Sequence, residues 1–193
     1  MASNSSFFSL IASPGTDAWR KPPSVDVLNV PFRAEAPAFP LISFQRASVS
    51  FAGQWKERYD QGGLLLNLTH PTLKGKWLKT GVEFYNNRSY ISTVSTDAYS
   101  DWSIYPTDAK PGDKLTVEAV RESDENGKSL WVYWVKLDES GKVVERLPLR
   151  EVNWIFAQED GWQLHVGAYA ARPEKKTNDL LEVKFWNLQV EKK

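Results

Sequence analysis

The sequence predicts an all-β protein, an antiparallel sandwich of two sheets, on three observations. From residue 41 onward, short runs rich in β-branched and aromatic residues follow one another at a spacing of roughly ten residues, which is typical of sandwiches. Turn-forming residues separate several of these runs, at Gln61-Gly62-Gly63, Asn86-Asn87, Asp124 to Gly127 and Ser140-Gly141. The 193 residues show neither an internal repeat nor a linker, so we expect residues 1–193 to form a single domain.

Nine strands are expected, at residues 43–52, 63–68, 76–85, 89–96, 100–105, 114–122, 129–137, 162–169 and 181–190. One short helix is expected around Val152 to Gln158. Residues 1–40 contain six of the eleven prolines, and proline fixes φ and removes a backbone donor. We therefore expect residues 1–40 to be irregular and to wrap the sandwich in extended pieces.

Charge and composition exclude several classes of partner. Lysine plus arginine equals aspartate plus glutamate at 24 each, so the formal net charge is zero. Nucleic-acid binding usually requires a basic surface that neutralises phosphates, and we expect no nucleic-acid partner. No apolar run is long enough to span a bilayer, so no membrane partner is expected either. With no cysteine and two histidines, the chain is expected to hold no metal and no cofactor.

The expected location is the cytoplasm. The apolar stretch Phe7 to Ala12 is too short for a secretory signal peptide and has no basic region before it. The lack of cysteine excludes the disulfides that are common in secreted proteins. Glycosylation sequons begin at Asn4, Asn67 and Asn87, and we interpret them as chance matches.

The segment from Trp77 to Tyr85 alternates in a way that assigns its two faces. Side chains along a strand point to opposite faces with a period of two. One face carries Leu78, Thr80, Val82 and Phe84 and is expected to be core. The other face carries Trp77, Lys79, Gly81, Glu83 and Tyr85.

The next strand is expected to pair with this segment through a tight hairpin. Asn86-Asn87 tolerates the positive φ values that such a turn requires. A two-residue loop would place Glu83 opposite Tyr90, Gly81 opposite Ser92, and Lys79 opposite Val94. Opposite charges, hydroxyls and large rings on one face suit a polar ligand that also has apolar C–H faces, as a sugar has.

Short motifs in a fixed order connect the chain to a known family. They are Thr16-Asp17 with Trp19-Arg20, Tyr59-Asp60-Gln61 with Gly63-Leu64, alternating Trp77, Lys79, Gly81 and Glu83, alternating Ser92, Val94 and Thr96, Ser100-Asp101-Trp102-Ser103, and Val166-Gly167 with Ala170 and Pro173. Over residues 16–190 the chain resembles a largely uncharacterised concanavalin-like family of bacteria and fungi, one fungal member of which is named regulation of enolase protein. The chain departs from the family pattern at Gly62, where alanine is expected, and in the long loop from Asn67 to Lys76.

The resemblance implies a jelly-roll sandwich of the concanavalin A type, with a concave face on which related folds hold sugars. It implies no established activity. With the face assignment, it leads us to expect that one groove is formed by Asp60, Gln61, Trp77, Lys79, Glu83, Asp101 and Trp102. Lys79 would meet an anionic or hydroxyl group, Glu83 and Asp60 would accept hydrogen bonds from hydroxyls, and Trp77 or Trp102 would stack on the ligand.

Two functional hypotheses follow. The first is an intracellular module that binds a small polar ligand, a sugar or a phosphorylated metabolite, and regulates carbohydrate metabolism through a metabolic enzyme. The second is a carbohydrate-active enzyme of the same fold, in which Glu83 acts with a carboxylate from Asp60 or Asp101. Three plainer interpretations stay open: a solvated sheet face for Lys79 and Glu83, turn-forming roles for Asp60 and Asp101, and a protein-interaction domain with exposed aromatic residues.

Overall fold

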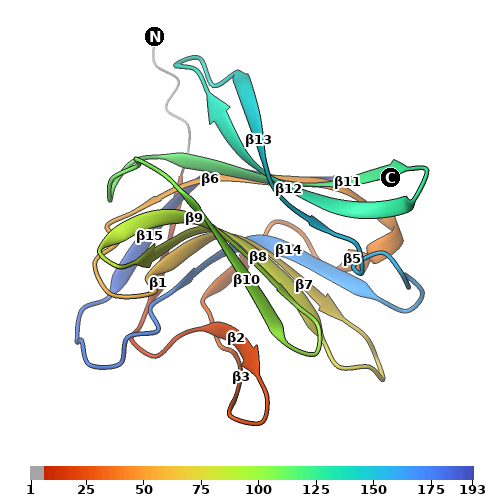
Figure 1. The fold of residues 1–193 in the computed structure, drawn as a ribbon, viewed down its shortest axis with the longest axis horizontal. Coiled ribbons are helices and arrows are strands. Elements are labelled where there is room, and N and C mark those ends of the chain that lie inside the picture. The colour runs from red at the N-terminus through yellow and green to blue at the C-terminus, as the bar shows by residue number, and fades with distance from the viewer. Residues whose placement is uncertain (1–6) are drawn as a thin grey trace.

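The computed structural model describes residues 7–193 as two antiparallel sheets packed face to face (Figure 1). The six-stranded sheet has the order β1 (Phe8–Ala12), β15 (Leu181–Lys192), β6 (Phe44–Gly53), β11 (Leu115–Asp124), β12 (Gly127–Leu137) and β13 (Val143–Val152). The seven-stranded sheet has the order β10 (Ser100–Pro106), β9 (Arg88–Thr96), β8 (Lys76–Tyr85), β7 (Gln61–Thr69), β14 (Gln163–Ala171) and β4 (Phe32–Ala34), and β5 (Phe39–Pro40) also pairs with β14. The predicted antiparallel sandwich is confirmed.

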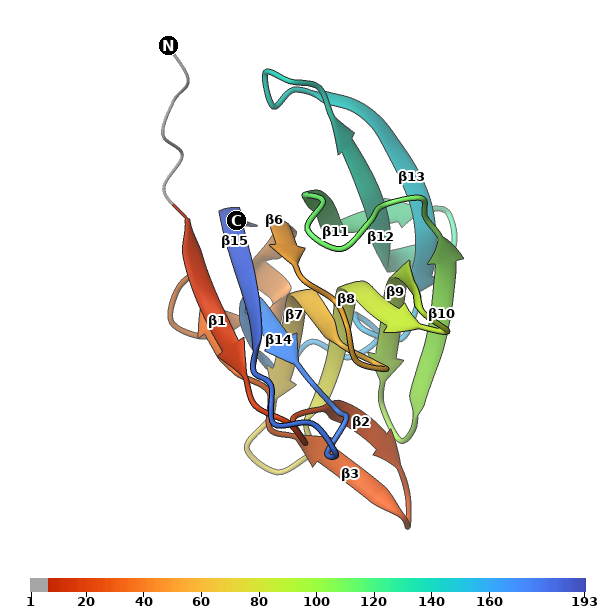
Figure 2. The same cartoon turned by 90° about the vertical axis from the view of Figure 1, so that its left-hand side faces the viewer.

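A separate hairpin forms a third layer. It consists of β2 (Ala18–Lys21) and β3 (Val25–Leu28). Figures 1 and 2 show this hairpin on the side of the seven-stranded sheet that faces away from the six-stranded sheet. The outer face of the seven-stranded sheet is therefore partly covered.

The core lies between the two sheets. Leu64 and Val82 of the seven-stranded sheet belong to one buried cluster with Val117 and Phe185 of the six-stranded sheet. Burial of each such side chain contributes roughly 1.5–3 kcal/mol. Leu78, Val82 and Phe84 of β8 all belong to this cluster, as the alternation predicted.

Two expectations about secondary structure were wrong, one of them in part, and one strand was missed. Residues 8–40 do run in short extended pieces, as expected, but these pieces are the strands β1 to β5 and are not irregular; residues 1–6 are outside the described part of the chain. The expected helix at Val152 to Gln158 is a series of bends and turns after β13. The strand β13 itself was missed because its proline and charged residues hide the pattern, although proline is tolerated on an edge strand such as this one.

The predicted hairpin register between β8 and β9 is confirmed. Glu83 lies opposite Tyr90, Gly81 opposite Ser92, and Lys79 opposite Val94. Asn86 and Asn87 have φ values of 48° and 58°, which are the left-handed conformations that a two-residue hairpin loop of this type requires.

Two opposed glycines bring β7 and β8 together without side chains. Gly63 pairs with Gly81, and the two share the outer face with Lys79 and Glu83. A Cβ on Gly81 would lie 2.0 Å from the carbonyl oxygen of Gly62, and one on Gly63 would lie 2.1 Å from that of Thr80. The sheet therefore carries no side chain between Lys79 and Glu83, which leaves a hollow at this place.

In the part of the chain that the structure describes, helix is confined to a short 3₁₀ turn at Leu41–Ser43. Within residues 7–193, no helix has the length and apolar character needed to cross a membrane.

Candidate ligand-binding pocket

A pocket lies on the outer face of the seven-stranded sheet, beside hairpin β2–β3. Its volume is about 230 Å³, and its lining residues are Asp17, Trp19, Tyr59, Gln61, Lys79, Glu83 and Trp102. One molecule of liquid water takes about 30 Å³. The pocket thus has the volume of several waters, which suits one small ring.

Arg20 fastens the hairpin to the sheet and so fixes one wall of the pocket. Its Nη1 donates to the carbonyl oxygens of Gly75 at 2.9 Å and Asp97 at 2.7 Å, while its Nε donates to Asp26 Oδ1 at 2.8 Å. The guanidinium also lies 4.4 Å from the ring centroid of Trp77. With its charge paired and its Nε and Nη1 donors engaged, Arg20 can remain almost fully buried. Asp17 and Trp19, just before Arg20, are held at the pocket in this way.

Lys79 is a buried cation held by an amide and a carboxylate. Its side chain is 2% exposed; the ammonium donates to Gln61 Oε1 and lies 3.8 Å from Asp17 Oδ1. Gln61 Nε2 donates to the same Asp17 oxygen at 3.3 Å and to the carbonyl oxygen of Tyr59 at 3.2 Å. A buried charge is tolerated only when it is paired, so Asp17, Gln61 and Lys79 form one interdependent group.

Glu83 lies across the glycine pair from Lys79. Its Oε2 accepts a hydrogen bond from Ser92 Oγ at 2.9 Å, and Ser92 Oγ accepts one from Trp102 Nε1 at 3.1 Å. Burial raises the pKa of Glu83, and the carboxylate of Asp17 raises it further. The Lys79 ammonium and the donors Ser92 and Trp102 oppose this rise without cancelling it.

Aromatic rings form another part of the pocket wall. Tyr59 and Tyr85 stack with their centroids 5.6 Å apart, and Trp102 meets them edge-on at 6.3 Å and 5.6 Å. Arg58 covers the Tyr59 ring at 4.5 Å. These contacts hold the rings in place, so that Tyr59 and Trp102 present preformed apolar surface to the pocket.

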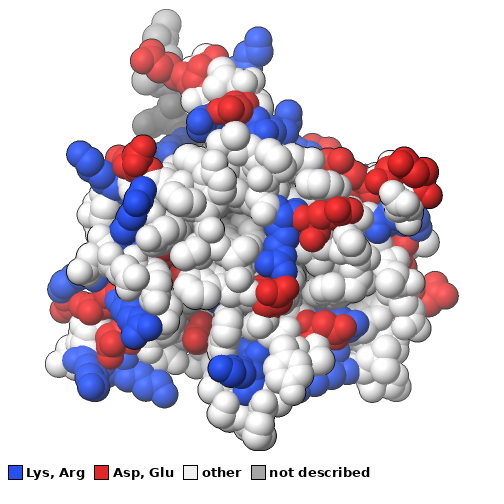
Figure 3. Space-filling model, in the orientation of Figure 1, with Lys and Arg blue, Asp and Glu red and all other residues white. Residues whose placement is uncertain are grey.

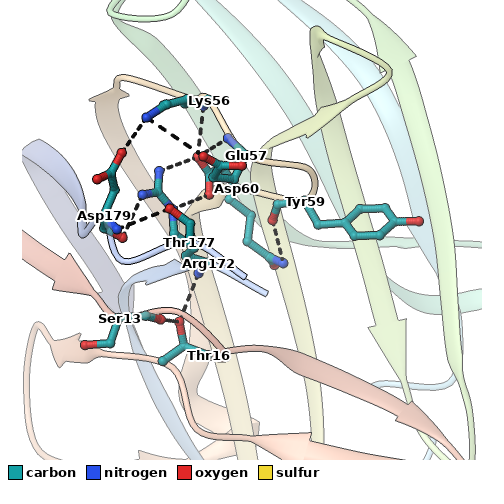
Figure 4. Close-up of polar contacts among 10 residues, drawn as sticks. Ser13, Thr16, Lys56, Glu57, Tyr59, Asp60, Arg172, Thr177 and Asp179 are labelled. Carbon is teal, nitrogen blue, oxygen red and sulfur yellow. Dashed lines mark hydrogen bonds and ion pairs between the residues drawn. The ribbon is translucent and has the colours of Figure 1, made fainter. Parts of the chain in front are cut away.

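Asp60 is directed away from the pocket into a buried ion pair (Figure 4). Its carboxylate accepts hydrogen bonds from Arg172 Nε at 2.8 Å and Nη2 at 2.7 Å, and from the backbone N–H groups of Lys56 and Glu57, both at 2.9 Å. Figure 4 shows the Tyr59 ring pointing away from this network. The expectation that Asp60 binds ligand hydroxyls was therefore wrong, because its acceptors are already used.

Trp77 and Asp101 also lie outside the pocket. Trp77 is on the predicted face but packs under Arg20 against Leu65 and Tyr169, and is 2% exposed. Asp101 is exposed and pairs with Arg150 of β13. It neighbours Trp102 in β10, and adjacent residues in a strand point to opposite faces, so the two cannot share the pocket. Neither Asp60 nor Asp101 is placed to act with Glu83 as the enzyme hypothesis required.

Four of the seven predicted residues are brought together: Gln61, Lys79, Glu83 and Trp102. Whether they bind a ligand stays a prediction. Three lining residues, Asp17, Trp19 and Tyr59, were not predicted as site residues. All three occur in the ordered motifs that connect the chain to its family, and that order was the signal that could have found them.

Charge is distributed without a dominant sign over the face drawn in Figure 3. Lysine and arginine side chains alternate with aspartate and glutamate around a broad uncharged area. This face therefore offers no extended basic surface of the kind that nucleic-acid binding uses.

The comparison with family models assigns the chain to a family. The model described as a protein of unknown function, DUF1349, matches residues 2–193. The chain belongs to the DUF1349 family. It is 41% identical over 184 residues to an uncharacterised protein of Emericella nidulans. This match covers 95% of this chain and 86% of that protein. It is also 35% identical over 57 residues to regulation of enolase protein 1 of Saccharomyces cerevisiae, and this match covers 30% of this chain and 27% of that protein.

Solved structures show the same fold. A functionally unknown protein from Saccharomyces cerevisiae superimposes with a TM-score of 0.67 at 21% identity, over 97% of this chain and 88% of that chain. A GH43 protein from Bacillus licheniformis does so with a TM-score of 0.56 at 14% identity, over 93% of this chain and 32% of that chain. At these identities the likenesses show a shared fold.

The Asp60–Arg172 pair predicts a large effect on stability. In Asp60→Asn the guanidinium of Arg172 would stay buried without its counter-charge, so the free energy of unfolding should fall by roughly 3–5 kcal/mol. Urea unfolding of the purified variant measures this loss. Asp101→Asn is the control, because it removes an exposed ion pair and should cost less than about 1 kcal/mol. Equal losses in the two variants would contradict the structural role of Asp60.

Glu83 predicts a dependence of stability on pH. Its pKa in the folded protein lies above the ordinary 4.5, so the folded state binds this proton more tightly than the unfolded state does. The resulting stabilisation is complete below pH 4.5 and is lost as the pH rises through the raised pKa. Glu83→Gln has no such proton to lose. Its free energy of unfolding, relative to that of the wild type, should rise as the pH increases from 4.5 through the raised pKa of Glu83. Denaturant titrations across this range test it, and a difference that stays constant or falls contradicts it.

Proposed function

We propose that this protein binds one small polar ring, a sugar, in the pocket between hairpin β2–β3 and the seven-stranded sheet. The observation that carries the proposal is the combination of buried hydrogen-bonding groups at Gln61, Lys79 and Glu83 with fixed aromatic rings at Tyr59 and Trp102. Pockets for small ligands usually combine apolar walls with a few convergent polar groups and a residue of perturbed pKa.

A sugar satisfies both kinds of lining group. Its hydroxyls donate to carboxylates and to the amide oxygen of Gln61, and they accept from the ammonium of Lys79. Its C–H faces suit the rings of Tyr59 and Trp102. The hollow over the glycine pair lies between Lys79 and Glu83, so one ring could reach both groups.

Binding is favoured over catalysis by the places of the carboxylates. Glycoside cleavage uses two carboxyl groups that flank the scissile bond. The partners expected for Glu83 were Asp60 and Asp101, and both are engaged by arginines outside the pocket. Asp17 does share the pocket with Glu83, but its Oδ1 already accepts from Gln61 Nε2 and from the backbone N–H of Ala18 and lies 3.8 Å from the ammonium of Lys79. The names of the similar proteins support a link to carbohydrate metabolism: one is a regulation of enolase protein and one is a GH43 protein.

Ligand-induced stabilisation tests the proposal. We expect a panel of sugars, sugar phosphates and glycolytic intermediates to contain a compound that, at 100 times its dissociation constant, raises the free energy of unfolding by about 2.7 kcal/mol. Glu83→Gln should abolish this response without lowering the melting temperature of the free protein. Thermal-shift measurements report both quantities.

Glu145→Gln is the matched control for this test, since Glu145 is exposed on β13 and pairs with Lys136. It should leave the response unchanged. If Glu83→Gln also leaves the response unchanged, Glu83 is part of an ordinary polar sheet face and the proposed site is wrong.

We further propose that the protein acts in the cytoplasm and passes the presence of the sugar to a metabolic enzyme. The absence of cysteine supports the location, and the partial match to regulation of enolase protein 1 supports the partner. Tagged protein purified from the cytosolic fraction of its host should carry a metabolic enzyme in an amount that changes when the sugar is added. Recovery only from secreted material, with glycans at Asn67 or Asn87, would overturn the location.

A further inference from the structure

The pocket lining contains more acidic than basic side chains. Of the described residues that line it, Asp17 and Glu83 carry carboxyl groups and Lys79 carries the ammonium. Lys79 is already engaged by Gln61 and faces Asp17 at 3.8 Å. No cationic charge in the lining is therefore free of a carboxylate to receive an anionic ligand.

A phosphate group would meet unfavourable surroundings in this pocket. A phosphate monoester carries a charge of about −1.5 to −2 at pH 7. Inside the pocket it would approach Asp17 and, above the raised pKa of Glu83, a second carboxylate as well, and repulsion between like charges is strong where water is excluded. The exposed Arg58 lies on the Tyr59 ring, donates to Tyr59 Oη at 2.7 Å, and does not line the pocket.

Neutral ligands meet no such penalty, and for a positively charged ligand the attraction of Asp17 and Glu83 opposes the repulsion from Lys79. An amino group would be attracted by Glu83 and Asp17, and aromatic faces such as those of Tyr59 and Trp102 favour cations. A neutral hydroxyl can use the same carboxylates as acceptors.

We infer that the pocket accepts a sugar ring without negative charge, either a neutral or an amino sugar, and rejects the phosphorylated and acidic forms of the same ring. This inference rests on the proposed function. It narrows the ligand class, because the sequence alone left a phosphorylated metabolite open.

Matched derivatives of one ring separate charge from shape. Glucose, galactose and mannose would each be titrated calorimetrically in four forms: the free sugar, the 2-amino sugar, the 6-phosphate and the uronic acid. For the ring that binds, the neutral or amino form should bind at least about tenfold more tightly than either anionic form, a difference of about 1.4 kcal/mol. A phosphate or uronate that binds equally well or better overturns the inference while leaving the proposed function intact. If none of the forms binds, the inference and the proposed function are both contradicted.

Asp17→Asn tests the cause of this selectivity. The variant keeps an oxygen that can accept the backbone N–H of Ala18, as Asp17 Oδ1 does at 2.7 Å, so hairpin β2–β3 should stay in place. It removes one carboxylate and leaves the ammonium of Lys79 available to an anion. The affinity ratio of the free sugar to its 6-phosphate should therefore fall by about tenfold or more.

Asp101→Asn is the control, because it removes one carboxylate outside the pocket and should leave the ratio unchanged. Circular dichroism confirms that both variants are folded. An unchanged ratio in a folded Asp17→Asn variant contradicts the inference.

Discussion

The buried ion pair between Asp60 and Arg172 joins the segments from which the pocket is built. Asp60 closes the turn that begins at Lys56, and this turn holds Tyr59 in a left-handed conformation with φ of 67°. The backbone N–H of Arg172 donates to Thr16 Oγ1, which fixes the residue before Asp17. Replacing a buried ion pair by apolar side chains is often neutral or stabilising, so such a pair is weak evidence for stability. Its importance here is positional, because Tyr59 and Gln61 lie far from Asp17 in the sequence and the one ion pair helps to orient all three.

The pocket combines two demands that oppose each other. It needs polar groups that are dry enough to hold a ligand strongly, and every buried polar group needs a partner of its own. The structure meets the first demand by burying Lys79 and Glu83, and the second by giving them Gln61, Asp17 and Ser92. Burial outweighs the donors and the ammonium around Glu83 and raises its pKa, the direction expected when the charged form is not fully compensated. A ligand hydroxyl that donates to Glu83 would compensate part of the charge of its carboxylate.

The sequence predicted those parts of the site that depend on local pattern. Alternation placed Lys79 and Glu83 on one face of a strand, and Asn86-Asn87 gave the register with β9. Local pattern failed to predict the role of a residue where a partner distant in the sequence determines that role. Asp60 looked like a ligand-binding residue because Arg172, its partner, lies 112 residues away. Trp77 looked available because the hairpin that carries Arg20 had no strong strand pattern. The prediction of Asp101 failed for a different reason. Asp101 and Trp102 are adjacent in β10, so alternation along the strand could have excluded Asp101 from the face that carries Trp102.

The pairing of β1 with β15 has a consequence for synthesis. Ser9 donates to Glu182 across this pair, at a separation of 173 residues in the chain. Strand β15 lies between β1 and β6, so both of these strands present open backbone edges until residues 181–192 have left the ribosome. Pairing over such distances is slow, and unpaired edges attract other chains. Until β15 is made, the six-stranded sheet cannot close, and the nascent chain exposes edges of β1 and β6 that other chains could pair with.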